Sequence, residues 1–255
     1  MILAVLQARV SSSRLPGKVL LDLHGAPMII RQIERVKRAR RIDALVVATS
    51  TAPEDDALAD LCASHGIACA RGSLHDVLDR VVQVARPHEP EWIVRLTGDC
   101  PLADPELVDA VVEFAEQNAC DYASNAVQPT YPDGLDVEVV RMAVLERAWA
   151  EAVLASEREH VTPFIYKRPD DFRVGHFCGQ EDLSAMRWTV DEPEDLAFAR
   201  AVYAALYDAN PAFSTADVLG LLQQRPELSH INATFARNEG YAKSLEDDKK
   251  GGAPQ

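Results

Sequence analysis

Apolar runs of strand length alternate with amphipathic segments of helix length through the first half of the chain, and this alternation restricts the fold more than any other feature. MILAVLQA at 1–8 and DALVVATS at 43–50 are typical of strands covered on both faces, and PMIIRQIERVKRA at 27–39 has helical spacing. The pattern continues with strands at 67–71 and 91–102, the latter running into a loop, and with helices at 53–66, 75–86 and 104–118. It predicts an α/β fold of three layers, in which a mainly parallel mixed sheet has helices on both faces.

The second half of the chain is less regular. Strand-like runs at 120–125, 135–140, 172–178 and 186–190 have few helices between them, and a clear helix follows at 191–208. We therefore expect a small, partly antiparallel insertion in the α/β core. We find no linker or internal repeat, so residues 1–240 are predicted to form a single domain. The polar, Gly-rich residues at 241–255 are predicted to be a disordered tail.

Charge is distributed unevenly along the 255 residues. The net charge of −14 argues against a protein that coats nucleic acid, and we expect no nucleic-acid partner. Residues 1–41 nevertheless contain nine Lys or Arg residues against only Asp22 and Glu34. This local excess favours one anion site near the amino terminus, although the cations between Arg31 and Arg41 also fit the solvated face of a helix.

The cysteines and the apolar runs indicate the cellular compartment in which the protein is expected. Five cysteines are scattered, with no CxxC pair and no Cys/His spacing for zinc. The opening apolar run is too short for a signal peptide, and no segment reaches the length of a membrane span. We therefore expect a cytoplasmic protein.

The loop QARVSSSRLPGK at 7–18 directly follows the first predicted strand. Ligands of open α/β sheets bind beyond the carboxyl ends of the strands, where this loop would lie. Gly17 and the serines let the backbone approach a ligand closely, and Arg9, Arg14 and Lys18 supply the charge that a triphosphate needs. The loop matches neither GxxxxGK[ST] nor GxGxxG. The residues alone favour an anion-binding loop over an ordinary surface loop.

The same string resembles the opening signature of the sugar-activating cytidylyltransferases, and within them the spore coat polysaccharide biosynthesis protein F group. It is also similar to that of the synthetases of CMP-KDO and CMP-sialic acid. The resemblance continues in order through VVATST at 46–51, RGSLHDVLDR at 71–80, VRLTGDCPLADP at 94–105, YPDGLDVEV at 131–139, EREHVTPFIY at 157–166 and RWTVDEPEDL at 187–196. It implies the nucleotide-diphospho-sugar transferase type of α/β fold, and an enzyme of polysaccharide or glycan biosynthesis.

Asp99 in LTGDCPL and Asp191 in TVDEPEDL match the metal-binding aspartates of that family. Taken alone, each also fits a turn or a helix cap. Two carboxylates from separate strand ends could instead hold one Mg²⁺, which binds oxygen ligands and usually keeps substrate phosphates. The resemblance favours Mg²⁺ as cofactor, held by both aspartates.

Three residues are assigned to the sugar side of the site. Asp136 lies in the segment that borders the sugar in the family, although its alternation with apolar neighbours also fits a strand with one wet face. Arg158 and His160 in EREHVTPFIY could meet a sugar carboxylate or hydroxyl, and His160 fits a structural histidine equally well.

The resemblance implies that a sugar oxygen attacks the α-phosphate of CTP and that pyrophosphate leaves. The substrates would be CTP and a sugar acid or sugar phosphate. Arg14 and Lys18 would stabilise charge on the leaving pyrophosphate, as the catalytic residues. The nucleotide site would include Gln7, Ala8, Arg9, Ala48, Thr49 and Arg71.

Two alternative functions stay open. One is a glycosyltransferase of the same fold that uses Asp136 and Glu138 on a metal, although a donor without pyrophosphate to release needs less positive charge in the loop. The other is a nucleotide-binding protein without catalytic activity. A homodimer is possible, because relatives in the family are commonly dimers.

Overall fold

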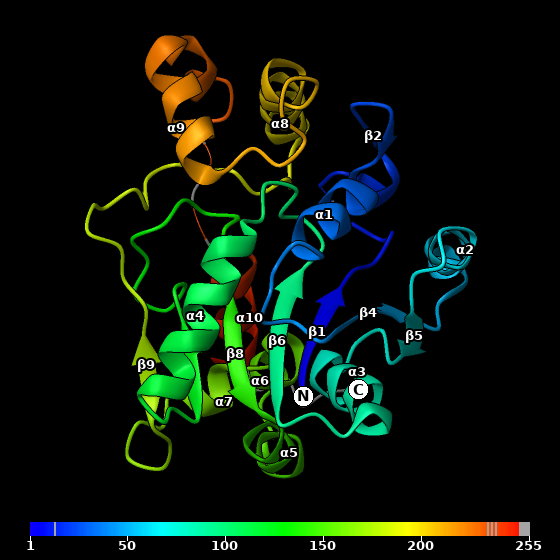
Figure 1. The fold of residues 1–255 in the computed structure, drawn as a ribbon. Coiled ribbons are helices and arrows are strands. Elements are labelled where there is room, and N and C mark those ends of the chain that lie inside the picture. Colours follow the sequence, from blue (N-terminus) through cyan, green and yellow to red (C-terminus); the bar gives the residue numbers. More distant parts are fainter. Residues whose placement is uncertain (13, 234, 236, 238, 250–255) are drawn as a thin grey trace.

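A seven-stranded mixed sheet forms the centre of the computed structural model, which describes residues 1–12, 14–233, 235, 237 and 239–249 (Figure 1). The strand order is β5-β4-β1-β6-β8-β7-β9, and only β8 runs antiparallel to its neighbours. The strands are β1 Ile2–Gln7, β4 Ala44–Ser50, β5 Cys69–Gly72, β6 Trp92–Thr97, β7 Tyr122–Ser124, β8 Glu138–Arg141 and β9 Val174–His176. A separate small antiparallel sheet pairs β2 Asp22–Leu23 with β3 Ala26–Pro27.

Helices cover both faces of the large sheet, and α1 and α4 lie in front of it in Figure 1 with α10 behind. The helices are α1 Met28–Val36, α2 Asp56–Ser64, α3 Val77–Ala85, α4 Pro105–Gln117, α5 Met142–Glu151, α6 Ala155–His160, α7 Pro163–Tyr166, α8 Pro193–Leu206, α9 Thr215–Gln224 and α10 Glu239–Lys249. Short 3₁₀ turns are Lys18–Leu20, Pro53–Asp55, Arg86–His88 and Pro226–His230. The predicted three-layer α/β fold with a mainly parallel sheet is confirmed.

Alternate residues of β1 contribute to two separate hydrophobic cores. Leu3 and Val5 pack with side chains of α3, α5 and α7, whereas Ala4 and Leu6 pack with side chains of α1, α2, α4 and α8. This is the period of two that a strand buried on both faces requires. The apolar run at the start of the sequence is therefore explained by its central position, between β4 and β6.

Local signals fixed several helix ends. Asp104 caps α4 as predicted, because its carboxylate accepts hydrogen bonds from the backbone N–H groups of Glu106 and Leu107. Gly66 follows the end of α2 with φ of 62°, a left-handed conformation that favours glycine. Both signals are readable without knowledge of the tertiary structure.

Two segments differ from the prediction. The strand expected at 186–190 forms only an isolated bridge between Arg187 and Asp133, and the backbone there runs as a connection between the sheet and α8. The closing segment, expected to be a disordered tail from 241, continues helix α10 to Lys249, and this helix contacts α6. Residues 250–255 of the expected tail lie outside the described residues.

Across the part of the chain that the structure describes, no helix combines the length and the apolar character needed to cross a membrane.

Candidate active site

A cleft of about 1750 Å³ opens along the edge of the sheet where β1 and β6 end. Its walls come from the loop after β1, the start of α3, the turn after β6, the residues before β8, the end of α6 and part of 187–191. Because β8 runs antiparallel to β6, the residues that precede β8 reach the same edge as those that follow β6. The topology thus gathers distant segments around one cavity.

The loop after β1 approaches the turn after β6 closely. A Cβ atom on Gly98 would lie 2.7 Å from the Cβ of Ala8, so only glycine fits this position. The N–H of Gly98 donates to the carbonyl of Gln7 at 2.8 Å, which continues the strand pairing into the turn. Asp99 is thereby held beside the basic loop.

The Lys18 ammonium lies between the carboxylates of Asp99 and Asp191. Its Nζ is 3.2 Å from Oδ2 of Asp99 and 2.8 Å from Oδ1 of Asp191, and it donates to the carbonyl of Val190 at 2.9 Å. The lysine and the two aspartates are separated by 81 and 173 positions in the sequence. The three predicted site residues therefore meet at one point of the cleft.

The electrostatics of this group are strongly coupled. Burial by itself would lower the pKa of Lys18, but Asp99 and Asp191 more than compensate, and the pKa is raised. For Asp99, burial would raise the pKa, but the charge of Lys18 together with hydrogen bonds from Thr97, Lys18 and Cys100 outweighs it, and the pKa is lowered to about 2. At neutral pH the lysine is therefore charged and Asp99 is ionised.

Asp191 is available to Lys18 because another aspartate caps α8. Asp195 accepts hydrogen bonds from the N–H groups of Asp191 and Glu192, at 3.0 and 2.9 Å. Asp195 is itself fixed by two contacts of 2.9 Å from the buried guanidinium of Arg187. The capping role that the sequence left open for Asp191 thus belongs to Asp195 and Glu192.

Two further cations contact Asp191. Nη2 of Arg14 lies 2.9 Å from Oδ2 of Asp191, and Nη2 of Arg187 lies 3.3 Å from the same oxygen. Arg14 also approaches Glu192 at 3.5 Å. Both predicted catalytic residues, Arg14 and Lys18, are consequently paired with carboxylates in this structure.

The donor set at Lys18 suits a hard divalent cation. Among the described residues there is no group of three or more His, Cys, Asp or Glu side chains placed to hold a metal. Two carboxylates already converge on one positive charge, however, and Mg²⁺ is commonly held by one or two carboxylates together with substrate phosphates. Asp99 and Asp191 therefore fit the predicted Mg²⁺ site if substrate completes the coordination.

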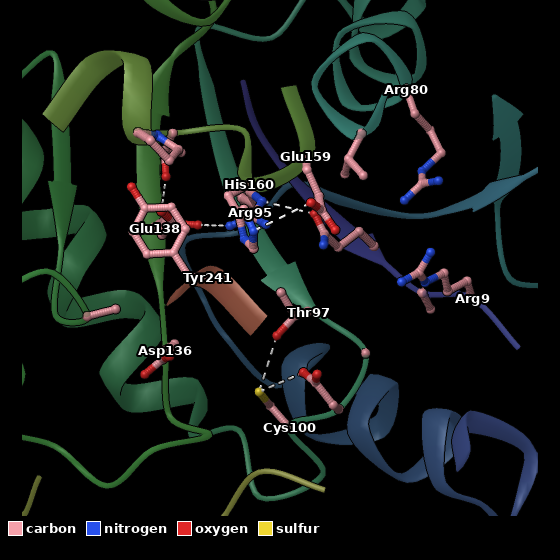
Figure 2. A pocket seen from close by; sticks show the side chains of 18 of the residues that line it. Arg9, Arg80, Arg95, Thr97, Cys100, Asp136, Glu138, Glu159, His160 and Tyr241 are labelled. Carbon is pink, nitrogen blue, oxygen red and sulfur yellow. Dashed lines mark hydrogen bonds and ion pairs between the residues drawn. The ribbon is translucent and has the colours of Figure 1, made fainter. Parts of the chain in front are cut away.

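Arg9 and Arg80 form a second positive region of the cleft, and their guanidinium groups face the same space in Figure 2. Arg80 is 2% exposed, its Nη1 donates to the carbonyl of Ser73, and its Nε has no hydrogen-bond partner. Burial, then the charges of Arg9 and Arg95, lower the pKa of Arg80 to about 10. Within the described part of the chain neither Arg9 nor Arg80 has a carboxylate partner, which makes this region attractive to an anion.

The other predicted nucleotide residues are divided by the fold. Gln7 and Ala8 line the cleft, and Oε1 of Gln7 accepts a hydrogen bond from Arg95. Ala48 and Thr49 are fully buried in β4 and do not line it. Arg71 is also outside it, where it donates to two backbone carbonyls and pairs with Asp56. These three lie one or two strands away from β1, on β4 and β5.

The three predicted sugar-side residues all line the cleft, and Asp136 and His160 lie apart from Arg9 and Arg80 (Figure 2). Asp136 lines the cleft, where burial raises its pKa to about 7 despite the opposing charge of Arg237. His160 contacts Tyr241, and burial lowers its pKa, which favours the neutral ring at pH 7. Arg158 lines the cleft but pairs with Asp76, the cap of α3, and with the carbonyl of Trp149.

Several residues of the cleft were not among the predicted site residues, although Glu138 was named as a metal ligand in the glycosyltransferase alternative. Glu138 accepts hydrogen bonds from Tyr122 and Thr162 and pairs with Arg95. A cation in the middle of an otherwise apolar central strand was a signal for Arg95. Arg187 is the first residue of the motif RWTVDEPEDL, but its partners are set by the tertiary structure. Arg237 and Tyr241 fell in or beside the expected tail and gave no local signal.

The fold and the cleft together define an α/β protein with an arginine- and lysine-lined cleft at the carboxyl edge of its sheet. A family model described as cytidylyltransferase matches residues 3–219, and the chain belongs to this family.

Relatives of known name agree with this assignment. The spore coat polysaccharide biosynthesis protein SpsF of Bacillus subtilis is 35% identical over 235 residues, which cover 89% of this chain and 95% of that protein. A 3-deoxy-manno-octulosonate cytidylyltransferase of Anaeromyxobacter is 31% identical over 240 residues, covering 79% and 97%. The solved structure of a cytidylyltransferase from Leptospira borgpetersenii superposes with a TM-score of 0.86 at 28% identity, covering 92% and 99%.

Proposed function

We propose that this protein transfers the cytidylyl group of CTP to an oxygen of a sugar acid or sugar phosphate and releases pyrophosphate. The observation that carries the proposal is the meeting of Lys18, Asp99 and Asp191 in one cleft that also contains Arg9 and Arg80, which have no carboxylate partner among the described residues. Phosphoryl-type transfer requires positioning and charge neutralisation more than covalent chemistry from the protein. The cations of the cleft would neutralise charge, and its two aspartates would help to position the substrates through the metal ion.

The reaction breaks one bond and forms one bond at the α-phosphorus. The acceptor oxygen attacks that phosphorus, and the bond to the oxygen that bridges to the β-phosphorus breaks, so that pyrophosphate leaves with its electron pair. A sugar phosphate attacks through an oxygen that is already ionised, whereas a sugar hydroxyl releases its proton to solvent as the new bond forms. Asp99 and Asp191 would hold Mg²⁺, which supplies positive charge to the phosphate and to the attacking oxygen. Arg14 and Lys18 stabilise the charge that develops on pyrophosphate.

Because Lys18 and Arg14 are paired with carboxylates, both cations must leave these carboxylates before they can contact a bound triphosphate. A triphosphate competes with Asp191 for both cations, whereas Arg9 and Arg80 need to give up no carboxylate. We therefore assign the first contact with the triphosphate to Arg9 and Arg80. Transfer of Lys18 and Arg14 to the phosphates would leave Oδ2 of Asp99 and Oδ1 of Asp191 available to Mg²⁺, while Arg187 keeps its contact with Oδ2 of Asp191.

The loop after β1 also forms the nucleotide site. The N–H of Ala8 donates to the carbonyl of Ala48 at 3.1 Å, so Ala48 and Thr49 support the loop from β4 instead of touching the ligand. Arg71 supports the neighbouring segment through the carbonyls of Ser50 and Ala52. Gln7, Ala8 and Arg9 are the members of the predicted set that reach the cleft.

The acceptor class is inferred from the relatives. SpsF is named for polysaccharide biosynthesis and the Anaeromyxobacter protein for 3-deoxy-manno-octulosonate, so we place this chain in the biosynthesis of a surface polysaccharide or glycan. The half of the cleft around Asp136 and His160 is where the acceptor would bind.

A glycosyltransferase that holds a metal with Asp136 and Glu138 is less compatible with the geometry. The carboxylate of Glu138 is already engaged by Arg95, Tyr122 and Thr162, so a metal there would have to displace the ion pair with Arg95, whose side chain is nearly buried.

A thermal-shift screen with ATP, CTP, GTP and UTP, each with Mg²⁺, tests the nucleotide, since a ligand of the native state raises Tm. CTP is expected to raise Tm most. A pyrophosphate assay with CTP and a panel of 2-keto-3-deoxy sugar acids, sialic acids and sugar 1-phosphates then tests transfer. No response to CTP, or no pyrophosphate with any acceptor, would contradict the proposed function.

A further inference from the structure

The C-terminal segment adds a wall to the acceptor half of the cleft. The family model ends at residue 219, whereas α10 begins at Glu239 and packs against α6. The last two residues of α6, Glu159 and His160, line the cleft, as does Tyr241 of α10 (Figure 2). The wall is therefore built outside the part of the chain that the family model matches.

Polar contacts fix α10 on α6. Oγ of Ser244 lies 3.0 Å from Nε2 of His160 and donates to Glu159 at 2.8 Å. The ring of Tyr241 meets the ring of His160 edge-on, with centroids 4.8 Å apart. One turn further along, a carboxylate oxygen of Asp248 accepts from the N–H of Ser156 at 3.2 Å. The orientation of the His160 ring is thus set by α10.

Arg237 fixes the other side of the same half. Its Nη2 pairs with Asp136, its Nη1 donates to the carbonyl of Tyr131 at 3.1 Å, and its Nε lies 3.8 Å from Asp133. The side chain of Arg237 is only 14% exposed, so these charges interact with little screening by water. Arg237 compensates the charge of Asp136 and adds to the charge that Arg187 already supplies to Asp133.

The segment forms a wall and does not fill the cleft. With α10 in place the cavity still measures about 1750 Å³, whereas small-molecule sites commonly measure about 300–1,000 Å³. A nucleotide and a sugar therefore fit beside the docked segment. Arg237 also improves the field for an anionic acceptor, because without it the carboxylate of Asp136 would lose its ion pair and would repel a carboxylate or phosphate, whereas Asp133 would keep its pair with Arg187.

We propose that Arg237 and Tyr241 are positioning residues of the acceptor subsite, which orient Asp136 and His160 for an anionic sugar. This inference rests on the proposed function, because it assigns the acceptor half of that same site. The C-terminal segment would therefore affect the affinity for the acceptor, but it would not affect the affinity for the nucleotide.

Point variants of the full chain test the two contacts. Arg237→Gln removes the charge and Arg237→Lys keeps it. Tyr241→Ala removes the ring, and Tyr241→Phe keeps it. Arg225→Gln is the matched control, since Arg225 lies in the same part of the chain beyond residue 219 but forms an exposed ion pair with Glu227. KM for CTP, and KM for the acceptor that releases pyrophosphate fastest in the panel, are measured for each.

We expect Arg237→Gln and Tyr241→Ala to raise the acceptor KM roughly tenfold with the CTP KM unchanged, the pattern of lost binding at one substrate. Arg237→Lys and Tyr241→Phe should recover most of the affinity, and Arg225→Gln should match the wild type. Equal losses for both substrates would indicate a merely structural role and overturn the inference. A lower acceptor KM in Arg237→Gln would also overturn it, because the segment would then obstruct the site.

The inference and the proposed function fail in different ways. If wild-type protein shows no Tm shift with CTP or no transfer, the proposed function fails and the inference fails with it. If wild-type protein transfers the cytidylyl group but the four variants leave the acceptor KM unchanged, only the inference fails.

Discussion

Lys18 is the residue on which the site is centred, because its ammonium takes the place between two carboxylates that a divalent ion could occupy. The sequence indicated that Lys18, Asp99 and Asp191 would share a cleft, since each follows or borders a strand end. It could not indicate that the lysine would pair with both aspartates. That pairing depends on side-chain distances that only the folded chain sets.

Replacement of Lys18 by Met should separate its structural role, which is to neutralise Asp99 and Asp191, from its proposed catalytic role. The variant leaves Asp99 and Asp191 facing each other, so we expect a loss of about 1–3 kcal/mol in the free energy of unfolding without metal. Mg²⁺ should raise the Tm of the variant more than that of the wild type, because it relieves the repulsion. The kcat/KM should fall about 100-fold or more. Lys37→Met, at an exposed position, is the control. An equal Mg²⁺ response in both proteins would contradict the assignment of this pair.

Asp136 should give a recognisable pH dependence of stability. Burial raises its folded pKa to about 7, above the value of 3.8 expected for the unfolded chain. Between about pH 4 and 7 the native state therefore retains a proton that the unfolded state has released, and the stability from this group falls as pH rises. Asp136→Asn lacks this contribution. Its stability relative to wild type, measured by urea unfolding, should increase from pH 4 to 7 and stay constant above 7. A constant difference across that range would refute the raised pKa.

The connection at 187–191 shows why some elements could be predicted and others could not. β1 and α4 carry their signals in their own residues: an apolar run for the strand, and Asp104 with Pro105 for the helix start. Residues 187–191 also have alternating apolar residues, but they are held by the loop at Gly134 and by the turn at Asp99. The helix α10 was missed for the same reason, since its stabilising contacts are with α6.

Gly134 should be essential to that connection. It has φ of +104°, and a Cβ there would lie 2.3 Å from the backbone nitrogen of Thr189. Gly134→Ala is therefore expected to lower the free energy of unfolding by more than about 2 kcal/mol, from strain and overlap together. Gly220→Ala is the matched control in helix α9, with no atom within 4 Å of the added carbon. It should be neutral or stabilising by up to about 1 kcal/mol. Differential scanning calorimetry compares the two, and similar Tm values would show that the connection is not fixed by this glycine.

The molecule as a whole has two hydrophobic cores that share one sheet. Leu3 and Leu6 of β1 are both fully buried but belong to different cores. Because the sheet is common to both, neither core can lose its packing without exposing the strands of the other. The order of the layers could be predicted from the strand–helix alternation, whereas the position of the C-terminal segment could not.

This arrangement predicts one cooperative unfolding transition, consistent with the single domain expected for 1–240. Leu3→Ala and Leu6→Ala should each lower the stability of the same transition, by about 2–5 kcal/mol. Calorimetric and van't Hoff enthalpies should agree in all three proteins. Two resolved transitions, with each variant shifting a different one, would contradict a single domain.

The direction of β1 has a practical consequence for handling the protein. Residue 1 lies at the rim just before the start of β6, since its carbonyl accepts from the N–H of Glu91 at 2.9 Å. Gln7 reaches the cleft about 20 Å further along the strand. A purification tag fused ahead of Met1 therefore leaves from the rim remote from the substrates. A tag placed after residue 255 would instead be fused to the segment that carries Tyr241 of the cleft. Kinetic measurements are therefore best made with the amino-terminal fusion.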